Sequence, residues 1–205
     1  GSIRAFAPGT TPMEVAKNIS EGFARNVISA SFEGTTIETS TPLTTDGSLI
    51  LYTWNDAEGK KAFWHSTSHV MAQVLEEMFP GIQLTLGPAI ANGFYYDVDF
   101  GDQKITEADF KAIESRILEI SKEKHEFKMR AVTKAEALET YKDNVYKTEL
   151  ISNLEDGTIT FCDHATFTDL CRGGHIPNTS IIKAVKIMSV AGAYWRGDEK
   201  NKQLT

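Results

Sequence analysis

Three threonines, each followed three residues later by an acidic residue, constrain the fold of this 205-residue chain most strongly. The pattern is typical of a capping box, in which the two side chains satisfy free N–H groups at the start of a helix. The sequence therefore predicts helices that begin at Thr11, Thr106 and Thr133. In the second of these, over residues 106–126, apolar residues recur at helical spacing: Phe110, Ile113, Ile117 and Ile120.

Strand-forming segments surround the first helix. Residues 26–32 and 35–39 flank Glu33-Gly34, a turn signal, and predict a hairpin. Residues 49–53 predict a further strand, and residues 3–6 predict a short strand ahead of the helix. One helix with several strands in so short a segment predicts a small ubiquitin-like β-grasp domain.

A polar segment at residues 55–61 interrupts this pattern, so we place a domain boundary there, between residues 1–61 and residues 62–205. In the second domain, residues 66–79 predict a helix that Pro80-Gly81 ends. Residues 144–154 predict a further helix. The strand-forming segments of this domain are residues 82–90, 93–100, 158–162 and 181–190. Helices and strands thus occur in separate runs, which predicts an α+β fold with an antiparallel sheet.

Composition excludes several classes of protein. Hydrophobic residues make up 41% of the chain, enough for a core, but no run approaches the roughly 18 apolar residues of a membrane span. We see no signal peptide and only two cysteines, so we expect a cytoplasmic protein without a disulfide framework or a membrane partner. The net charge of -7 argues against a nonspecific nucleic-acid binder. Residues 171–205 are nevertheless locally basic, and this stretch could bind a polyanion or be an ordinary solvated surface.

Two histidines form the first candidate site. His65 lies directly before the predicted helix at residues 66–79, and His69 lies within it. His65 and His69 stand four residues apart, which places both imidazoles on one side of a helix. At about 100° per residue, the apolar residues of the helix fall on the opposite side. These residues are Val70, Met71, Val74, Leu75 and Met78. The pair can face a cleft, or the two can be surface histidines that share this spacing by chance.

A second candidate cluster lies in the segment Asp169-Leu-Cys-Arg-Gly-Gly-His175. Gly173 and Gly174 allow a tight loop that could bring Cys171 and His175 together. Together with the histidine pair, these residues make four nitrogen and sulfur ligands, a number that suits tetrahedral zinc. From the residues alone, a zinc site, a metal-free polar pocket and two unrelated clusters all remain open.

Four motifs in order give the chain a family resemblance. Besides the histidine pair and the Asp169–His175 segment, they are Gly93-Phe-Tyr-Tyr-Asp97 and Ala191-Gly-Ala-Tyr-Trp-Arg-Gly-Asp198. Across essentially its whole length, the chain resembles the amino-terminal part of bacterial threonyl-tRNA synthetases. The resemblance implies a TGS domain, a β-grasp module, at residues 1–61. It implies an editing domain, a type shared with alanyl-tRNA synthetases, at residues 62–205.

The activity that the resemblance implies is proofreading. The editing domain of this family hydrolyses the ester that joins serine to the 3' end of threonine tRNA and spares threonyl-tRNA. Serine lacks one methyl group of threonine, and a missing methyl allows discrimination of only about 10–200-fold in a single binding step. A second pocket that admits serine and excludes threonine supplies the rest.

The resemblance also assigns roles to individual residues. His65 and Lys147 are the candidate catalytic residues, which place a water and stabilise an oxyanion. The candidate substrate-binding residues are His69, Tyr96, Asp169, Cys171 and His175, with Asp169 on the substrate amino group. The family uses the lysine beside its first histidine, whereas the residues alone predict that Lys147 is an exposed helix residue. No role falls on His125 or His164, and Cys162 is expected to be a buried strand residue.

The resemblance implies editing without a cofactor or metal. If that is wrong, the zinc ligands would be His65, His69, Cys171 and His175. ATP, magnesium and a catalytic zinc ion are expected only in a synthetic core that this chain lacks, and the full-length enzyme is expected to be a homodimer through that core. We therefore expect an editing fragment without ligase activity. The alternatives are a non-catalytic tRNA-binding appendage and a zinc-dependent hydrolase of the alanyl type.

Overall fold

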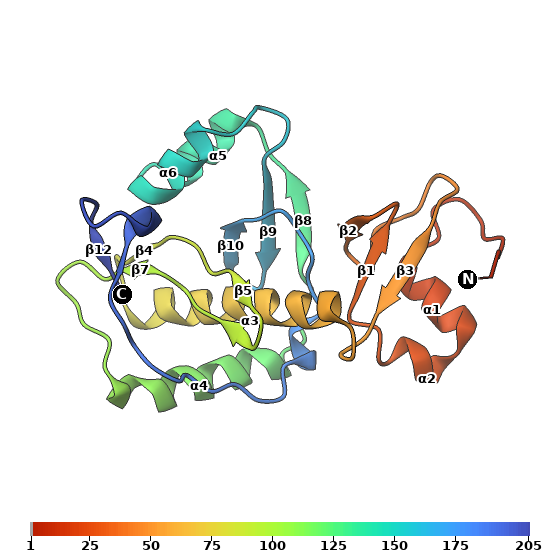
Figure 1. The fold of residues 1–205 in the computed structure, drawn as a ribbon, viewed down its shortest axis with the longest axis horizontal. Coiled ribbons are helices and arrows are strands. Elements are labelled where there is room, and N and C mark those ends of the chain that lie inside the picture. The colour runs from red at the N-terminus through yellow and green to blue at the C-terminus, as the bar shows by residue number, and fades with distance from the viewer. Residues whose placement is uncertain (1) are drawn as a thin grey trace.

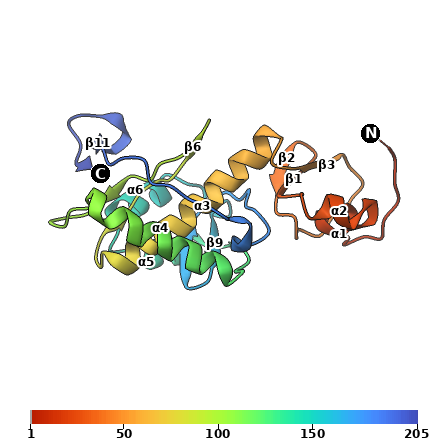
Figure 2. The same cartoon turned by 90° about the horizontal axis from the view of Figure 1, so that it is seen from below.

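Helix α3 (Ala57–Met78) joins the two regions of the molecule in the computed structural model, which describes residues 2–205. It runs across the centre of Figure 1, with a small N-terminal region at one end and the larger second region around the rest. Seen from below in Figure 2, the N-terminal region lies at one end of an elongated molecule. The helix begins well before the predicted start at residue 66, and the predicted boundary at residues 61 and 62 lies inside it.

The polar segment before residue 62 forms the start of α3. Asp56 takes the N-cap position, and its carboxylate accepts hydrogen bonds from the backbone N–H and the hydroxyl of Thr53. Gly59 then lets the helix approach the preceding turn, since a Cβ there would lie 2.0 Å from the carbonyl oxygen of Thr53. Polarity in this segment therefore reflects an exposed helix surface rather than a linker.

The N-terminal region packs two helices against a three-stranded antiparallel sheet. Its helices are α1 (Pro12–Ile19) and α2 (Glu21–Ala24), and its strands are β1 (Ser29–Phe32), β2 (Thr35–Ile37) and β3 (Leu49–Tyr52), in the order β2-β1-β3. The capping box at Thr11 and Glu14 and the hairpin around Glu33-Gly34 are confirmed. The strand predicted at residues 3–6 is wrong, because that segment pairs with no strand and the Ile3 side chain is fully exposed.

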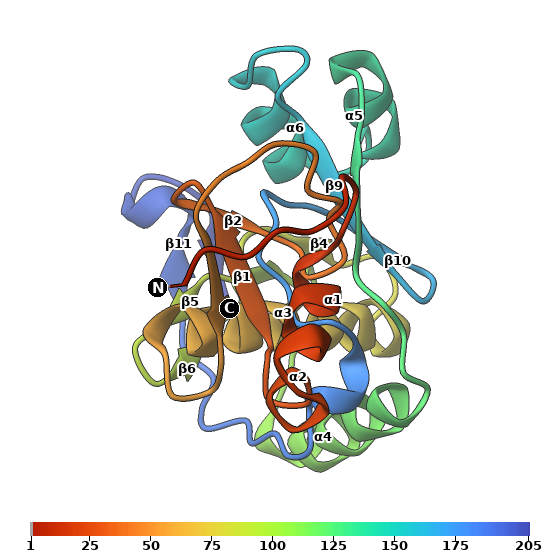
Figure 3. The same cartoon turned by 90° about the vertical axis from the view of Figure 1, so that its right-hand side faces the viewer.

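The second region contains most of α3, three further helices and several short antiparallel ladders. The helices after α3 are α4 (Glu107–Lys122), α5 (Lys134–Thr140) and α6 (Val145–Ser152). The main sheet has the order β10-β9-β8, formed by β8 (Lys128–Ala131), β9 (Thr160–His164) and β10 (Phe167–Leu170). Viewed end-on in Figure 3, this sheet lies between α5 and α6 on one side and α3 and α4 on the other.

Two-stranded ladders complete this region. Strand β4 (Gln83–Leu84) pairs with β7 (Val98–Asp99), β5 (Ala89–Ile90) with β6 (Gly93–Phe94), and β11 (Ala193–Tyr194) with β12 (Gln203–Leu204). Short 3-10 turns occur at η1 (Thr179–Ile181) and η2 (Trp195–Gly197). The β-rich segment predicted at residues 181–190 contains no strand, because it runs along α4 and the N–H of Ile187 donates to the carboxylate of Glu114 instead of to a ladder. The sequence thus predicts the mixed α and β content and the antiparallel pairing, whereas a β-grasp topology stays a prediction.

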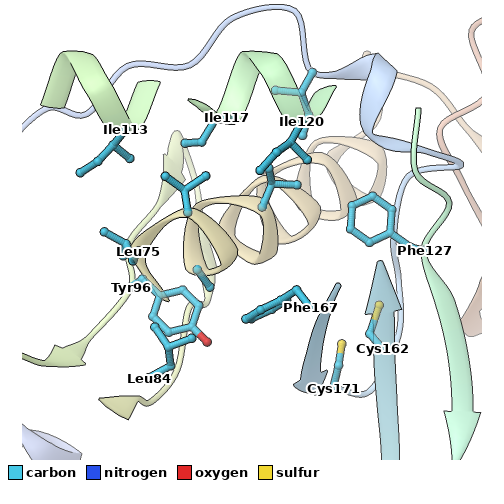
Figure 4. Close-up of a cluster of buried hydrophobic side chains, with 14 of the residues drawn as sticks. Leu75, Leu84, Tyr96, Ile113, Ile117, Ile120, Phe127, Cys162, Phe167 and Cys171 are labelled. Atoms are coloured by element: carbon cyan, nitrogen blue, oxygen red, sulfur yellow. The ribbon is translucent and has the colours of Figure 1, made fainter. Parts of the chain in front are cut away.

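The main core lies between α3, α4 and the sheet. The predicted apolar face of α4 is buried, with Ile113, Ile117 and Ile120 pointing toward α3 (Figure 4). Phe127, Phe167 and Cys162 close the core from the side of the sheet. This packing holds α3 in place between two layers, so that its polar residues are fixed relative to β10.

Candidate functional site

The two predicted clusters meet at one place in the second region. The Nε2 atom of His65 lies 3.1 Å from the Sγ atom of Cys171, and the Nε2 atom of His175 lies 3.3 Å from the same sulfur. The Nε2 atoms of His65 and His69 are 3.3 Å apart. The juxtaposition predicted from the sequence is therefore present, while the chemical roles of these residues remain predictions.

Local structure explains how residues so far apart in the sequence converge. Helix α3 carries both histidines of the first cluster on one side, and β10 ends directly before Cys171. Gly173 and Gly174 then have φ values of +93° and +88°, in the left-handed region that favours glycine. The chain turns back at these glycines and places His175, which is fully buried, beside the sulfur.

A second set of polar side chains surrounds Asp169, which lies on β10 next to the histidine and cysteine cluster. Lys147, from the first turn of α6, forms an ion pair with its Oδ1 atom. Its Oδ2 atom accepts a hydrogen bond of 2.9 Å from the hydroxyl of Tyr96 and lies 3.2 Å from Nδ1 of His69. His69 therefore links the carboxylate to the histidine and cysteine cluster.

Lys147 departs from what the residues alone predict. Its side chain is 2% exposed rather than solvated, because α6 turns it toward Asp169. Cys162 is confirmed as a buried residue of β9, and its sulfur lies 3.7 Å from Nδ1 of His175. Glu38, whose carboxylate lies against His175, was not predicted as a site residue, since nothing in the hairpin that precedes it marks one.

Burial and neighbouring charges together set the ionisation of the site. Burial opposes the charge of Asp169, but Lys147 and His69 more than offset it and hold the pKa of that carboxyl well below its ordinary range. Burial also opposes ionisation of Cys171, yet hydrogen bonds with His175 and the other two histidines lower the pKa of the thiol well below its usual value. Burial lowers the pKa of His65, so this imidazole is neutral at pH 7 and can accept a proton.

A cavity of about 180 Å³ opens beside Asp169 and the two histidines of α3, whereas Cys171 and His175 do not line it. Its lining includes His65, His69, Tyr96, Lys147 and Asp169. Pockets for drug-sized ligands measure roughly 300–1,000 Å³, so this cavity suits a group of the size of one amino acid. A larger cavity of about 680 Å³ lies beside His164 and is lined by none of the predicted site residues, which is why we assign the site to the smaller one.

The donor set also fits a zinc ion by type. One ligand atom from each of His65, His69, Cys171 and His175 lies within 4.8 Å of the other three. Zinc bonds of about 2.0–2.3 Å require a slightly tighter arrangement. The same four side chains can also hold one another by hydrogen bonds, so their geometry is compatible with both a metal site and a metal-free cluster.

No helix among residues 2–205 has the length and apolarity needed to cross a bilayer.

Residues 159–205, which include Asp169, Cys171 and His175, match the family described as the threonyl and alanyl tRNA synthetase second additional domain.

Similarity to complete proteins extends over the whole chain. The chain is 89% identical over 205 residues to a threonine–tRNA ligase of Flavobacterium johnsoniae and 84% identical to that of Flavobacterium psychrophilum. It is 55% identical to that of Parabacteroides distasonis, over 99% of the chain. It spans 32% of the length of each of these relatives. The chain is therefore a homologue of part of the bacterial threonine–tRNA ligases, with a second additional domain matched at residues 159–205.

Proposed function

We propose that this chain is a proofreading part of a threonine–tRNA ligase, which hydrolyses seryl-tRNA for threonine and spares threonyl-tRNA. The observation that carries the proposal is the 180 Å³ cavity, because a neutral imidazole, a lysine and a carboxylate all line it. These are the groups that ester hydrolysis needs: a base for water, a cation for the oxyanion and an anion for the substrate ammonium. The relatives named above support threonine tRNA as the partner.

In the proposed mechanism, His65 places a water molecule against the ester carbonyl and accepts a proton as the water attacks. Negative charge then develops on the carbonyl oxygen, and Lys147 stabilises it. Because the tetrahedral intermediate expels the 3' oxygen of the terminal adenosine, that oxygen must finally receive a proton, which the protonated His65 can return. Free serine and uncharged tRNA are the products.

Asp169 can bind the substrate ammonium only by sharing its carboxylate. Both oxygens already have protein neighbours, namely Lys147 on one side and Tyr96 and His69 on the other. An ionised carboxylate offers about four lone-pair positions, so one further donor can be accommodated. We expect the ammonium to take that position and the methyl group of threonine to be rejected by the size of the cavity.

The test is single-turnover deacylation at saturating enzyme, with seryl- and threonyl-tRNA assayed in parallel. We expect rapid hydrolysis of the seryl ester only. His65→Ala should lower the rate by about 10²–10⁴-fold, and Lys147→Ala by about 10²–10³-fold. Asp169→Ala should weaken both binding and rate, since the ammonium is charged before the reaction begins.

The control is His125→Ala, a histidine just after α4 whose ring contacts Glu123 and does not line the 180 Å³ cavity. It should leave the rate unchanged, while circular dichroism verifies that every variant is folded. Equal rates on the two esters would contradict the proposed selectivity. No turnover of either ester, with tRNA binding intact, would instead favour the non-catalytic tRNA-binding appendage.

A zinc-dependent hydrolase is the second candidate, and the closeness of the four donor atoms favours it. A zinc ion there would be held by His65, His69, Cys171 and His175 and would supply a Lewis acid. Metal analysis of the purified chain separates the two candidates. Stoichiometric zinc, with activity lost on chelation and restored by zinc, supports this candidate, whereas full activity after chelation supports metal-free editing.

The remaining parts of the proposal concern organisation. We propose a TGS domain at residues 1–61 and an editing domain at residues 62–205, in a cytoplasmic enzyme that is a homodimer through a separate synthetic core. ATP, magnesium and a catalytic zinc ion would belong to that core. Limited proteolysis of the chain, with the fragments identified by mass, tests the division into domains.

A further inference from the structure

Glu38 of the N-terminal region reaches the candidate site of the second region. It directly follows β2, and its side chain is 11% exposed. Its Oε1 atom accepts a 2.9 Å hydrogen bond from the backbone N–H of Gly174, and its Oε2 atom accepts one of 3.1 Å from the N–H of His175. The Oε1 atom also lies 3.0 Å from Nδ1 of the His175 ring. Two backbone donors and a ring nitrogen of one short loop thus converge on a single carboxylate.

The loop is shaped to hold an anion. Successive backbone N–H groups next to residues of left-handed conformation form a concavity that binds negative charge. Gly173 and Gly174 provide that conformation, and both approach the N-terminal region closely. A Cβ on Gly173 would lie 3.3 Å from the Glu38 carboxylate, and one on Gly174 would lie 3.2 Å from the methyl group of Thr36. Glu38 therefore fills a cradle that the loop presents to β2.

The contact between Nδ1 of His175 and Glu38 determines how the His175 ring is oriented. A ring nitrogen that faces an ionised carboxylate carries a proton, and the other nitrogen is then free to face its own partner. With Nδ1 turned to Glu38, Nε2 of His175 is left to meet the Cys171 sulfur at 3.3 Å. The other acceptor near Nδ1, the sulfur of Cys162, is farther away at 3.7 Å and is the weaker competitor.

We propose that Glu38 is a positioning residue for the site: it fastens the Gly173–His175 loop, holds the Nδ1 side of the His175 ring against its own carboxylate, and so sets where Cys171 and His175 stand. The N-terminal region then supplies one side chain that supports the site, although neither Glu38 nor His175 lines the cavity. The effect on rate rests on the proposed deacylation, whereas the effect on the ring does not.

The test therefore has two independent readouts on the 205-residue chain. The first is the protonation pattern of the His175 ring, read from ¹H–¹⁵N correlation spectra of the imidazole nitrogens and assigned with His175→Asn. The second is kcat and KM for deacylation of seryl-tRNA. We compare Glu38→Ala, which removes the acceptors, with Glu38→Gln, which offers one oxygen to three donors, and Glu38→Asp, which keeps both oxygens.

The matched control is Glu33→Gln. This residue lies in the turn between β1 and β2 and is bonded to the N–H of Ser48 within the N-terminal region. It tests whether loss of a carboxylate from this sheet is enough to disturb the site. We expect it to leave the His175 spectrum and kcat unchanged.

In the unmodified chain we expect a protected Nδ1–H signal for His175. Glu38→Ala should abolish it and lower kcat by about 10–100-fold with little change in KM. Glu38→Gln should show a partial loss, and Glu38→Asp should retain most of both properties. If Glu38→Ala does not fold, the Gln and Asp variants and the spectrum of the unmodified chain decide.

Three outcomes would overturn the proposal. One is a proton on Nε2 alone in the unmodified chain. Another is an unchanged His175 spectrum and kcat in Glu38→Ala, even if its melting temperature falls, because the contact would then be structural only. The third is an equal loss in Glu33→Gln. Absence of deacylation in the unmodified chain would contradict the proposed function, and the spectra alone would then test the role of Glu38.

Discussion

Asp169 and His164 lie on neighbouring strands and are equally buried, but they are held in opposite ways. The Asp169 carboxylate has a cation, a hydroxyl and an imidazole around it. Both ring nitrogens of His164 lack a hydrogen-bond partner in the part of the chain that the structure describes. The ring of His164 lies instead 5.0 Å from that of Phe127 and 5.3 Å from that of Phe167, measured between centroids.

The difference shows that partners, more than burial, decide whether a titratable group in this core is charged. Burial disfavours the charged form of both residues. At Asp169 the partners outweigh burial and the carboxylate is ionised. At His164 the charge of Asp169 opposes burial only weakly, and burial together with the nearby His69 and His175 lowers the pKa of the ring to about 3.

Removal of the cation beside Asp169 should have the largest effect. We expect Lys147→Met to lower the free energy of unfolding by about 3–5 kcal/mol, because it leaves a charged carboxylate buried without its partner. Urea unfolding at pH 7 measures the loss. The double variant Lys147→Met with Asp169→Leu should recover much of it, since the uncompensated charge is then gone. A loss below about 1 kcal/mol in the single variant would show that Asp169 does not depend on Lys147.

Removal of the hydroxyl beside Asp169 should have a smaller effect. Tyr96→Phe should cost about 2 kcal/mol, as expected for a hydrogen bond to a charged group. The comparison variant is Tyr141→Phe, whose hydroxyl donates to the backbone carbonyl of Thr168, and it should cost about 1 kcal/mol. Equal losses in the two variants would argue that Asp169 carries no charge.

His164 should make the fold sensitive to acid. Because its pKa falls from the ordinary 6.5 to about 3 on folding, the unfolded chain binds one more proton between these values. Stability from this residue is complete above pH 6.5 and is lost as the pH falls toward 3. At pH 5.5 the loss is about 1.4 kcal/mol.

The corresponding variant is His164→Leu. Its free energy of unfolding relative to the unmodified chain should improve by that amount between pH 8 and pH 5.5, whatever the difference at pH 8. Chemical unfolding at both values measures the change. An unchanged difference between the variants would mean that His164 has the same pKa in the folded and the unfolded chain.

An exposed ion pair should show the smallest effect. Glu139 lies on α5 and Lys142 lies just after it; their charged groups are 2.8 Å apart and mostly exposed. Lys142→Met should change the free energy of unfolding by less than about 0.5 kcal/mol, because solvent screens this pair. A loss comparable with that of Lys147→Met would contradict the view that burial gives the Asp169 pair its importance.

The sequence predicts those features that depend on neighbouring residues. The capping boxes at Thr11 and Thr106 and the hairpin at Glu33-Gly34 appear where expected, since caps and turns are local. The apolar face of α4 is buried as its spacing predicts. Strand β8 was not predicted, because its four residues are mostly exposed and are held in place by pairing with β9.

Among the site residues, too, the sequence predicts only what depends on neighbouring residues. The spacing of His65 and His69 marks them as a pair on one side of a helix. The burial of Lys147 could not be read from α6, because that helix has no clear apolar side and its rotation is set by contacts with Asp169 and β4. The role of Glu38 could not be predicted from the sequence either, since its partners lie more than a hundred residues away.

Helix α3 has a practical consequence for anyone who divides this protein for expression. At about 1.5 Å per residue its 22 residues form a rod of about 33 Å, which is shared between the two regions. A cut at the predicted boundary would remove the N-cap at Asp56 and the first turn, and it would leave Ala62 and Phe63 at a frayed end. It would also take away Glu38. A truncated chain should therefore start before Thr53 to keep the helix start, and it should be supplied with the N-terminal region in trans if the loop at Gly173–His175 is to keep its carboxylate.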